Sequence, residues 1–317
     1  MKRVYYARLS TEQRNPRSRR LDRLSAEQVV ALMNREDRRV LRAVGAARPQ
    51  IARAIEWIAS ALRAGGRLFF FGAGTSGRLG VIEAAECPPT FGTPPALIQA
   101  VMAGGRAAVF TSKEGAEDSG AAATLEVKRR VRKGDVVVGI AASGVTPFVR
   151  SALRAGRGLG AKAILVTCHK IAAVGADADL MIHLATGPEV LTGSTRLKAG
   201  SACKMALNML TTGAMVRIGK VYGHWMVDLQ PKSKKLVERG KRFIRELGGV
   251  PPSEAERLFK ETGGRVKLAI LMAQRGWSLQ RASAAIDLAG GFLGRALATR
   301  VPAPKSSRLK KSRPSRS

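Results

Sequence analysis

Five short apolar segments between residues 67 and 184 constrain the fold of this chain more than any other feature. Each has the length and composition of a buried strand. They are 67–71, 97–102, 135–140, 162–167 and 180–184, with helical segments between most of them at about 77–85, 115–132 and 147–159. Strands that are apolar on both faces and alternate with helices predict an α/β fold in which helices cover both sides of a parallel sheet. Right-handed crossovers then bring the loops after the strands to one edge of the sheet.

Helices are also expected on either side of this region. Apolar residues recur at helical spacing from Ser25 to about Arg63, with a break near Pro49. Ser25 followed by Gln28 has the form of a capping box, which marks a helix start. A long helix is expected over 194–217.

The pattern changes after Gly249, where no further strand is expected. Helical runs are predicted at 253–260, 265–274 and 278–289, and Ser253 with Glu256 resembles a second capping box. The expected domains are an N-terminal helical arm (1–50), the α/β domain (51–247), a small helical domain (248–298) and a basic, disordered tail (299–317).

The charge is strongly basic: 55 Lys and Arg residues against 23 Asp and Glu give a formal net charge of +32. Such an excess raises the possibility of nucleic-acid binding. Aromatic residues make up only 5% of the chain, and no aromatic ladder alternates with the basic residues to form a stacking platform. Part of the excess lies at the two ends of the chain, so solvated surface charge is the preferred interpretation and a nucleic-acid partner is not expected.

Cysteine and histidine are scarce, with three of each and no metal-ligand spacing among them. No metal site is therefore expected. Reduced thiols favour the cytoplasm. No apolar run approaches the roughly 18 residues of a membrane span, and the start lacks the apolar stretch of a secretory signal.

A glycine-rich turn, Gly72-Ala-Gly-Thr-Ser-Gly77, follows the first expected strand. Glycines let backbone amides approach an anion, and a helix N-terminus adds positive potential. Gly74, Thr75 and Ser76 are therefore candidate ligands of an anionic substrate. The turn lacks the Gly-Lys-Ser/Thr of a nucleotide P-loop and the acidic partner of a dinucleotide site. A plain strand-to-helix turn remains the alternative.

A second turn of the same design spans 141–147 after the third strand. Ser143 and Thr146 supply hydroxyls and Gly144 permits close approach, while Pro147 suits the start of a helix. Taken alone, function and a plain turn are about equally favoured. Two such turns at one sheet edge favour an anion site more strongly than either does alone.

A third candidate spans 193–200. Ser194 and Thr195 offer hydroxyls, and Arg196 and Lys198 offer positive charge. An ordinary helix N-cap with surface charges explains this segment equally simply and is preferred for it alone.

Acidic residues gather at two places. Glu83 and Glu86 lie on the helix that leaves the first turn, and Pro88 with Pro89 is expected to stop that helix and hold Glu86 at its end. Because this carboxylate is held beside two prolines, a functional role is favoured for it.

The second group is Glu114, Glu117 and Asp118, after the second expected strand. A parallel sheet permits this group and Glu86 to reach the same edge. Two carboxylates in different environments can serve as general acid and general base. For the second group, an acidic first helical turn favoured by the helix dipole is an equally good interpretation.

At these residues the chain resembles the N-acetylmuramic acid 6-phosphate etherase family. The similar segments, found in order over about residues 9–298, are 11–16, 34–37, 72–80, 86–92, 114–118, 142–147, 187–200 and 204–210. The resemblance implies a sugar-isomerase (SIS) fold, which is a doubly wound α/β sandwich, with a small C-terminal helical domain. It also implies a cytoplasmic homodimer that recycles cell-wall sugar and needs no cofactor.

The resemblance further implies the reaction, in which the D-lactyl ether of N-acetylmuramate 6-phosphate is eliminated and water is added. Ser143 and Thr146 are then expected to hold the phosphate, and Thr75 and Ser76 to hold phosphate or sugar hydroxyls. Glu86 is expected to be the proton donor, and Glu117 the second carboxyl group of the active site.

One departure concerns the second turn, where the family usually has Arg and this chain has Val145. Arg78, Arg196 or Lys198 are candidates to replace that cation. The rival interpretations are a non-catalytic sugar-phosphate sensor of the same fold and a sugar-phosphate isomerase. The presence of both Glu86 and Glu117 speaks against the sensor, and an isomerase would not need the segment from Glu86 to Pro89.

Overall fold

The computed structural model describes residues 7, 9–171 and 177–299. Five parallel strands form one sheet in the order β2-β1-β3-β4-β5, so the predicted doubly wound fold is confirmed. The expected tail, apart from Thr299, lies outside the described residues. The strands are β1 (Leu68–Gly72), β2 (Ile98–Met102), β3 (Val136–Ile140), β4 (Lys162–Thr167) and β5 (Leu180–His183).

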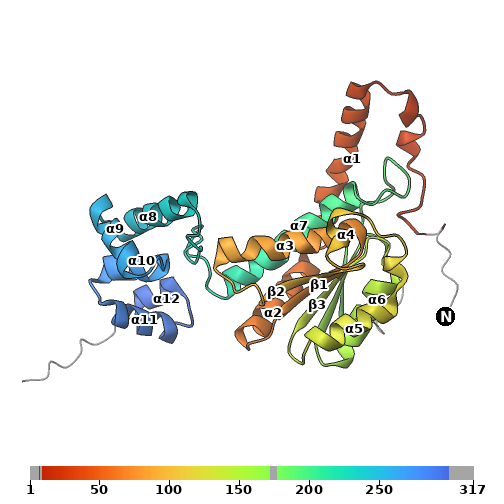
Figure 1. Ribbon diagram of the computed structural model, residues 1–317. Coiled ribbons are helices and arrows are strands. Elements are labelled where there is room, and N and C mark those ends of the chain that lie inside the picture. The colour runs from red at the N-terminus through yellow and green to blue at the C-terminus, as the bar shows by residue number, and fades with distance from the viewer. Residues whose placement is uncertain (1–6, 8, 172–176, 300–317) are drawn as a thin grey trace, which may run out of the picture.

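Helices cover both faces of the sheet, as Figure 1 shows. Phe70 packs into the core on one face, whereas Phe69 and Phe71 pack into the core on the other, because successive side chains of a strand alternate. All three are 0–1% exposed, which explains why β1 is apolar throughout. The first face carries α2 (Arg48–Arg63), α3 (Gly74–Phe91) and α7 (Lys198–Arg217); the second carries α5 (Gly120–Arg130) and α6 (Pro147–Gly158).

The predicted end of α3 is wrong. The helix passes through Pro88 and Pro89 and ends at Phe91. It stops where Gly92 adopts a left-handed φ of 63° and donates its backbone N–H to the carbonyl of Pro88. The prolines remove two helical donors near the C-terminus without ending the helix, and Glu86 lies before its last turn.

The N-terminal arm contains α1 (Ala26–Ala46), which begins with the predicted capping box of Ser25 and Gln28. The expected helical stretch is divided at Ala47, two residues before Pro49. In Figure 1, α1 and the segment before it extend beyond the sheet. Two short 3-10 turns, η2 (Pro16–Ser18) and η3 (Leu21–Arg23), lie in that segment.

The C-terminal helices share one apolar core, which also includes residues before the expected boundary at 248. These earlier residues include Val227 and Leu229, together with Phe243 and Ile244 of α8. The helices are α8 (Lys234–Gly248), α9 (Pro252–Glu261), α10 (Val266–Arg275), α11 (Leu279–Leu288) and α12 (Leu293–Ala298), of which α8 and α12 were not expected.

The second expected capping box is absent, because α9 begins at Pro252 with Pro251 as its N-cap and has no side-chain cap. None of the described helices is long and apolar enough to span a bilayer.

Candidate functional site

A cavity of about 370 Å³ opens at the carboxyl ends of β1 and β3. From β1 the chain passes to β2, on one side of β1, and then crosses to β3 on the other side of β1. The strand order therefore reverses between β1 and β3, and open α/β sheets bind ligands at such a topological switch point. The lining comes from the turns after β1 and β3, the loop after β2, the loop before α7 and the N-terminal arm. Its polar members include Glu12, Thr75, Ser76, Arg78, Ser112, Lys113, Glu114, Glu117, Ser143, Thr146 and Thr195.

The turn after β1 needs its glycines for close packing. A Cβ on Gly72 would lie 2.6 Å from the backbone N of Gly77, and a Cβ on Gly77 would lie 2.7 Å from the carbonyl O of Gly72. Helix α3 therefore starts directly at the strand end, with Gly74 at a φ of 53°. Thr75 and Ser76 lie in its first turn and line the cavity.

The turn after β3 brings Ser143 and Thr146 to the same cavity. Thr146 is the N-cap of α6, but its side chain makes no capping hydrogen bond. Gly144 is buried and has a φ of 74°, and a Cβ there would lie 2.4 Å from Cδ1 of Ile171. Gly144 is absent from the lining, so it shapes the turn. The structure thus brings the hydroxyls of the two predicted turns together.

The third predicted segment contributes only in part. Gly193 and Thr195 line the cavity, whereas Ser194 and the exposed Arg196 do not. Because α7 begins at Lys198, the hydroxyl residues precede the helix and do not occupy its first turn.

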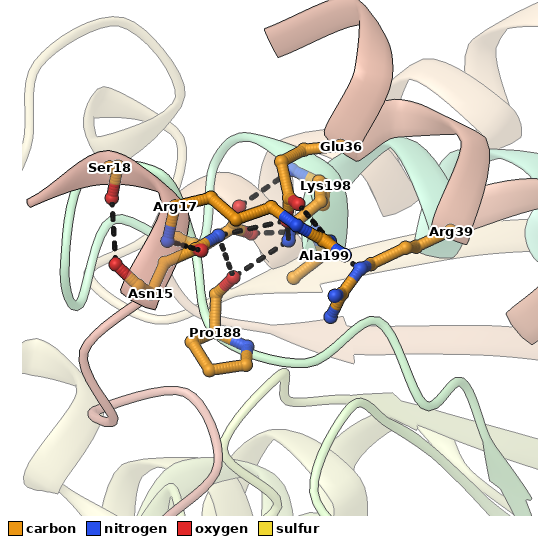
Figure 2. A network of polar contacts seen from close by, with 9 residues as sticks. Asn15, Arg17, Ser18, Glu36, Arg39, Pro188, Lys198 and Ala199 are labelled. Carbon is orange, nitrogen blue, oxygen red and sulfur yellow. Dashed lines mark hydrogen bonds and ion pairs between the residues drawn. The ribbon is translucent and has the colours of Figure 1, made fainter. Parts of the chain in front are cut away.

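The predicted position of Lys198 at the substrate site is corrected by the structure. Its side chain is 1% exposed, with Nζ 2.6 Å from Oε2 of Glu36 and 2.7 Å from the carbonyl O of Pro188. Asn15 and Arg17 donate to the same carboxylate at 2.8 and 2.9 Å (Figure 2). Lys198 therefore joins the arm to the body of the molecule and does not line the cavity.

Glu36 is fully buried at the centre of this network. Burial by itself raises the pKa of its carboxyl group, but hydrogen bonds from Lys198, Arg17 and Asn15 outweigh that effect and lower the pKa to about 2. The carboxylate is therefore charged at neutral pH, and Lys198 and Arg17 balance its negative charge.

The predicted carboxylates separate into two places. Glu114 and Glu117 line the cavity, and Glu117 lies on the short turn η4 (Ala116–Asp118). Glu86 is exposed and does not line it. It lies eleven residues after Thr75 on α3, roughly 16 Å along the helix axis at 1.5 Å per residue.

Glu83, the other acidic residue of α3, is buried against α7. Its carboxylate accepts hydrogen bonds from Thr211 at 2.5 Å, Lys204 at 3.1 Å and Asn208 at 3.3 Å. Burial, and then the charge of Glu83, raise the pKa of the Cys87 thiol to about 12. Cys87 is therefore a packed thiol without nucleophilic character at neutral pH.

Two cations line the cavity among the described residues, Arg78 and Lys113. Arg78 donates to the carbonyl oxygens of Val109 and Ala108 at 2.8 and 3.0 Å, so its guanidinium holds the loop after β2 in place. Of the three cations proposed to replace the family's Arg at Val145, only Arg78 reaches the cavity.

The sequence reasoning missed Leu9 and Glu12, which reach the cavity from the arm. The segment 11–16 belongs to the family resemblance, but nothing in its residue types indicated where it would dock. Within the described ranges, no group of three or more His, Cys, Asp or Glu residues is placed to hold a metal ion.

A parallel sheet with helices on both faces defines an α/β protein, and two family models identify it as one of the SIS class. Residues 116–213 match the SIS domain model, and residues 50–157 match the model of the glucokinase regulatory protein N-terminal SIS domain. The chain is 50% identical over 290 residues to N-acetylmuramic acid 6-phosphate etherase of Synechocystis sp., covering 91% of this chain and 95% of the relative. It is 47% identical to the etherase of Geobacillus thermodenitrificans, covering 91% of this chain and 98% of that relative. The chain belongs to the N-acetylmuramic acid 6-phosphate etherase family.

Proposed function

We propose that this protein cleaves the D-lactyl ether of N-acetylmuramic acid 6-phosphate and releases D-lactate and N-acetylglucosamine 6-phosphate in cell-wall amino-sugar recycling. It is thus a carbon–oxygen lyase, in keeping with its family. The observation that carries this function is the convergence of two hydroxyl-bearing turns and Glu117 on one cavity at the switch point. A volume of about 370 Å³ is suited to a small ligand such as a sugar phosphate.

The phosphate is assigned to the two turns that precede helices. Ser143 and Thr146 lie before α6, and Thr75 and Ser76 lie at the start of α3. Hydroxyl groups and the positive ends of two helices favour a dianion there. This arrangement anchors the sugar at its C6 end and leaves C2 and C3 further out in the cavity.

The chemistry is an elimination followed by hydration. Ring opening exposes an aldehyde at C1, which acidifies the proton on C2. A base removes that proton, the bond between C3 and the lactyl oxygen breaks, and an acid protonates the departing oxygen. Water then adds to C3 of the unsaturated intermediate. Each positioned proton-transfer group contributes on the order of a hundredfold or more in rate.

Glu117 is assigned one of these two proton transfers because it lines the cavity and matches the family pattern. The family pattern gives the other, protonation of the leaving oxygen, to Glu86. That residue faces solvent outside the cavity of its own chain, so we assign it to the cavity of a partner subunit.

The surface around Glu86 supports a homodimer. Ile82, one turn earlier on α3, is 46% exposed, and Met209 on the adjoining helix α7 is 40% exposed. An apolar side chain left open one turn from a functional carboxylate favours a contact between copies. A two-fold dimer uses the same patch twice and would complete both sites. The three free, buried cysteines favour a reducing compartment, and we place the enzyme in the cytoplasm.

Incubation of the purified protein with N-acetylmuramic acid 6-phosphate, coupled to a D-lactate dehydrogenase assay, tests the function. The proposal predicts stoichiometric lactate release. Binding of the sugar phosphate without release of lactate would instead favour the sensor interpretation.

Running the reaction in ¹⁸O-labelled water tests the route. Elimination and hydration place the label on C3 of the N-acetylglucosamine 6-phosphate, and the lactate stays unlabelled. Label in the hydroxyl group of lactate would mean that the other carbon–oxygen bond of the ether had been cleaved and would exclude this mechanism.

A further inference from the structure

Glu12 is a third carboxylate of the cavity and comes from outside the α/β domain. It is exposed to solvent, and with Leu9 it forms the part of the wall that the N-terminal arm provides. Leu9 is only 5% exposed, so this part of the arm is packed down at the cavity.

The arm is anchored on the amino-terminal side of Glu12. The backbone N–H of Ser10 donates to Nδ1 of His169 at 3.1 Å, and its hydroxyl donates to the carbonyl O of Cys168 at 3.2 Å. Both partners directly follow β4. Thr11, the next residue, is 2% exposed.

A second anchor lies three residues after Glu12. Asn15 is 4% exposed, and its amide donates to Glu36 at 2.8 Å and to the carbonyl O of Pro188 at 3.2 Å (Figure 2). Glu12 is therefore held between two buried attachment points. Such support keeps a carboxylate in position before a ligand binds.

The carboxylate of Glu12 lies beside Thr11 and Gly193. Its Oε1 accepts a hydrogen bond from Thr11 at 3.3 Å, and a Cβ on Gly193 would lie 3.1 Å from its Oε2. Glu117 follows β2, whereas Glu12 belongs to a segment tied to the end of β4. In the strand order β2-β1-β3-β4, the two carboxylates approach the crevice between β1 and β3 from opposite flanks.

The proposed substrate carries two anions, the 6-phosphate and the carboxylate of the lactyl group. A charged Glu12 repels both, so its favourable partners are the neutral hydrogen-bond donors of the sugar. We propose that Glu12 accepts hydrogen bonds from the hydroxyl or acetamido N–H groups of the aminosugar and fixes the sugar between the phosphate site and Glu117. This assignment rests on the proposed function and adds a specificity-determining residue to it.

The test compares wild type, Glu12→Gln and the control Glu27→Gln, which removes an exposed carboxylate on the first turn of α1, outside the cavity. Calorimetry measures the Kd of each protein for N-acetylglucosamine 6-phosphate and for inorganic phosphate. Loss of a charged hydrogen-bond acceptor predicts a rise of about tenfold or more in the Kd of Glu12→Gln for the aminosugar phosphate. Its Kd for inorganic phosphate should stay within about twofold of wild type, because Glu12 does not hold the anion. The control should match wild type for both ligands.

Two results for Glu12→Gln would overturn the assignment: unchanged affinity for the aminosugar phosphate, or an equal loss for both ligands, which would indicate a general disturbance of the cavity. Wild type that binds phosphate but not the aminosugar phosphate overturns the proposed function, and the assignment of Glu12 with it. If wild type binds the aminosugar phosphate and releases lactate, the proposed function stands, regardless of the result for Glu12→Gln.

Discussion

Nζ of Lys198 lies 2.6 Å from Oε2 of Glu36, in an ion pair that is closed to solvent and joins the start of α7 to the middle of α1. The two residues are 162 positions apart in the chain. Asn15 donates to the same carboxylate, so the pair also holds the segment that brings Glu12 to the cavity. A residue expected to bind substrate therefore acts in the attachment of the arm.

Replacing Lys198 with Met should lower the free energy of unfolding by about 3 kcal/mol, because Glu36 loses its buried ionic partner. Urea denaturation measures this change. Arg39→Met is the matched control: Arg39 is 40% exposed and lies 3.7 Å from the same carboxylate, so its removal should cost less than about 1 kcal/mol. Equal effects of the two substitutions would contradict the buried role of Lys198.

Acid should weaken this network, because protonation of Glu36 removes its contribution to the stability of the folded protein. The folded-state pKa of Glu36 is about 2, below the ordinary value of 4.5. Its contribution to stability is therefore fully present above about pH 4.5 and is lost as the pH falls towards 2. The difference in unfolding free energy between wild type and Glu36→Gln should shrink over that range. A difference that stays constant from neutral pH down to pH 2 would rule out the depressed pKa.

Glu117→Gln should reduce lactate release by on the order of a hundredfold or more while N-acetylglucosamine 6-phosphate still binds, since the amide keeps the shape but cannot transfer the proton. Steady-state kinetics and calorimetry separate the two effects. Asp118→Asn, one position further on and outside the cavity lining, should retain activity close to that of wild type. Substantial turnover in Glu117→Gln would remove Glu117 from the proton transfers.

Mixed dimers test the assignment of Glu86 to a partner subunit. Glu86→Gln and Glu117→Gln should each be inactive alone. If the subunits exchange at random in an equal mixture, half of the dimers contain one variant of each kind, and each of these has one complete site. Activity should then recover to about a quarter of wild type. No recovery after verified exchange would place both carboxylates in the site of one chain, or exclude Glu86 from the reaction.

Gly144→Ala should both destabilise the protein and weaken phosphate binding. Its φ of 74° strains any side chain, and the new methyl group would lie 2.4 Å from Ile171 and 2.8 Å from Oγ1 of Thr167. The cost should be about 1–3 kcal/mol. Gly158→Ala on α6 is the control, because nothing lies within 4 Å of the added carbon. Thermal melts and phosphate titration would detect the difference, and an unchanged Gly144→Ala would contradict the tight turn.

Most of the fold could be predicted from local patterns in the sequence. The ends of the strands were predicted to within one residue. A run such as 67–71 is apolar on both faces, and such a strand belongs to a sheet with helices over both of its faces. Local rules failed where packing overrode them. Proline preference alone placed the end of α3 too early, and the amphipathic helix α8 was missed although its apolar face supplies Phe243 and Ile244 to the C-terminal core.

The sequence by itself determined the parallel sheet, the two glycine- and hydroxyl-bearing turns and the family, because each depends on residues close together in the chain. Only the tertiary structure decided that Lys198 pairs with Glu36, that Glu86 is exposed outside the lining of its own cavity and that Glu12 reaches that cavity. The direction of a long polar side chain depends on partners far away in sequence. Neither periodicity nor motif spacing contains that information.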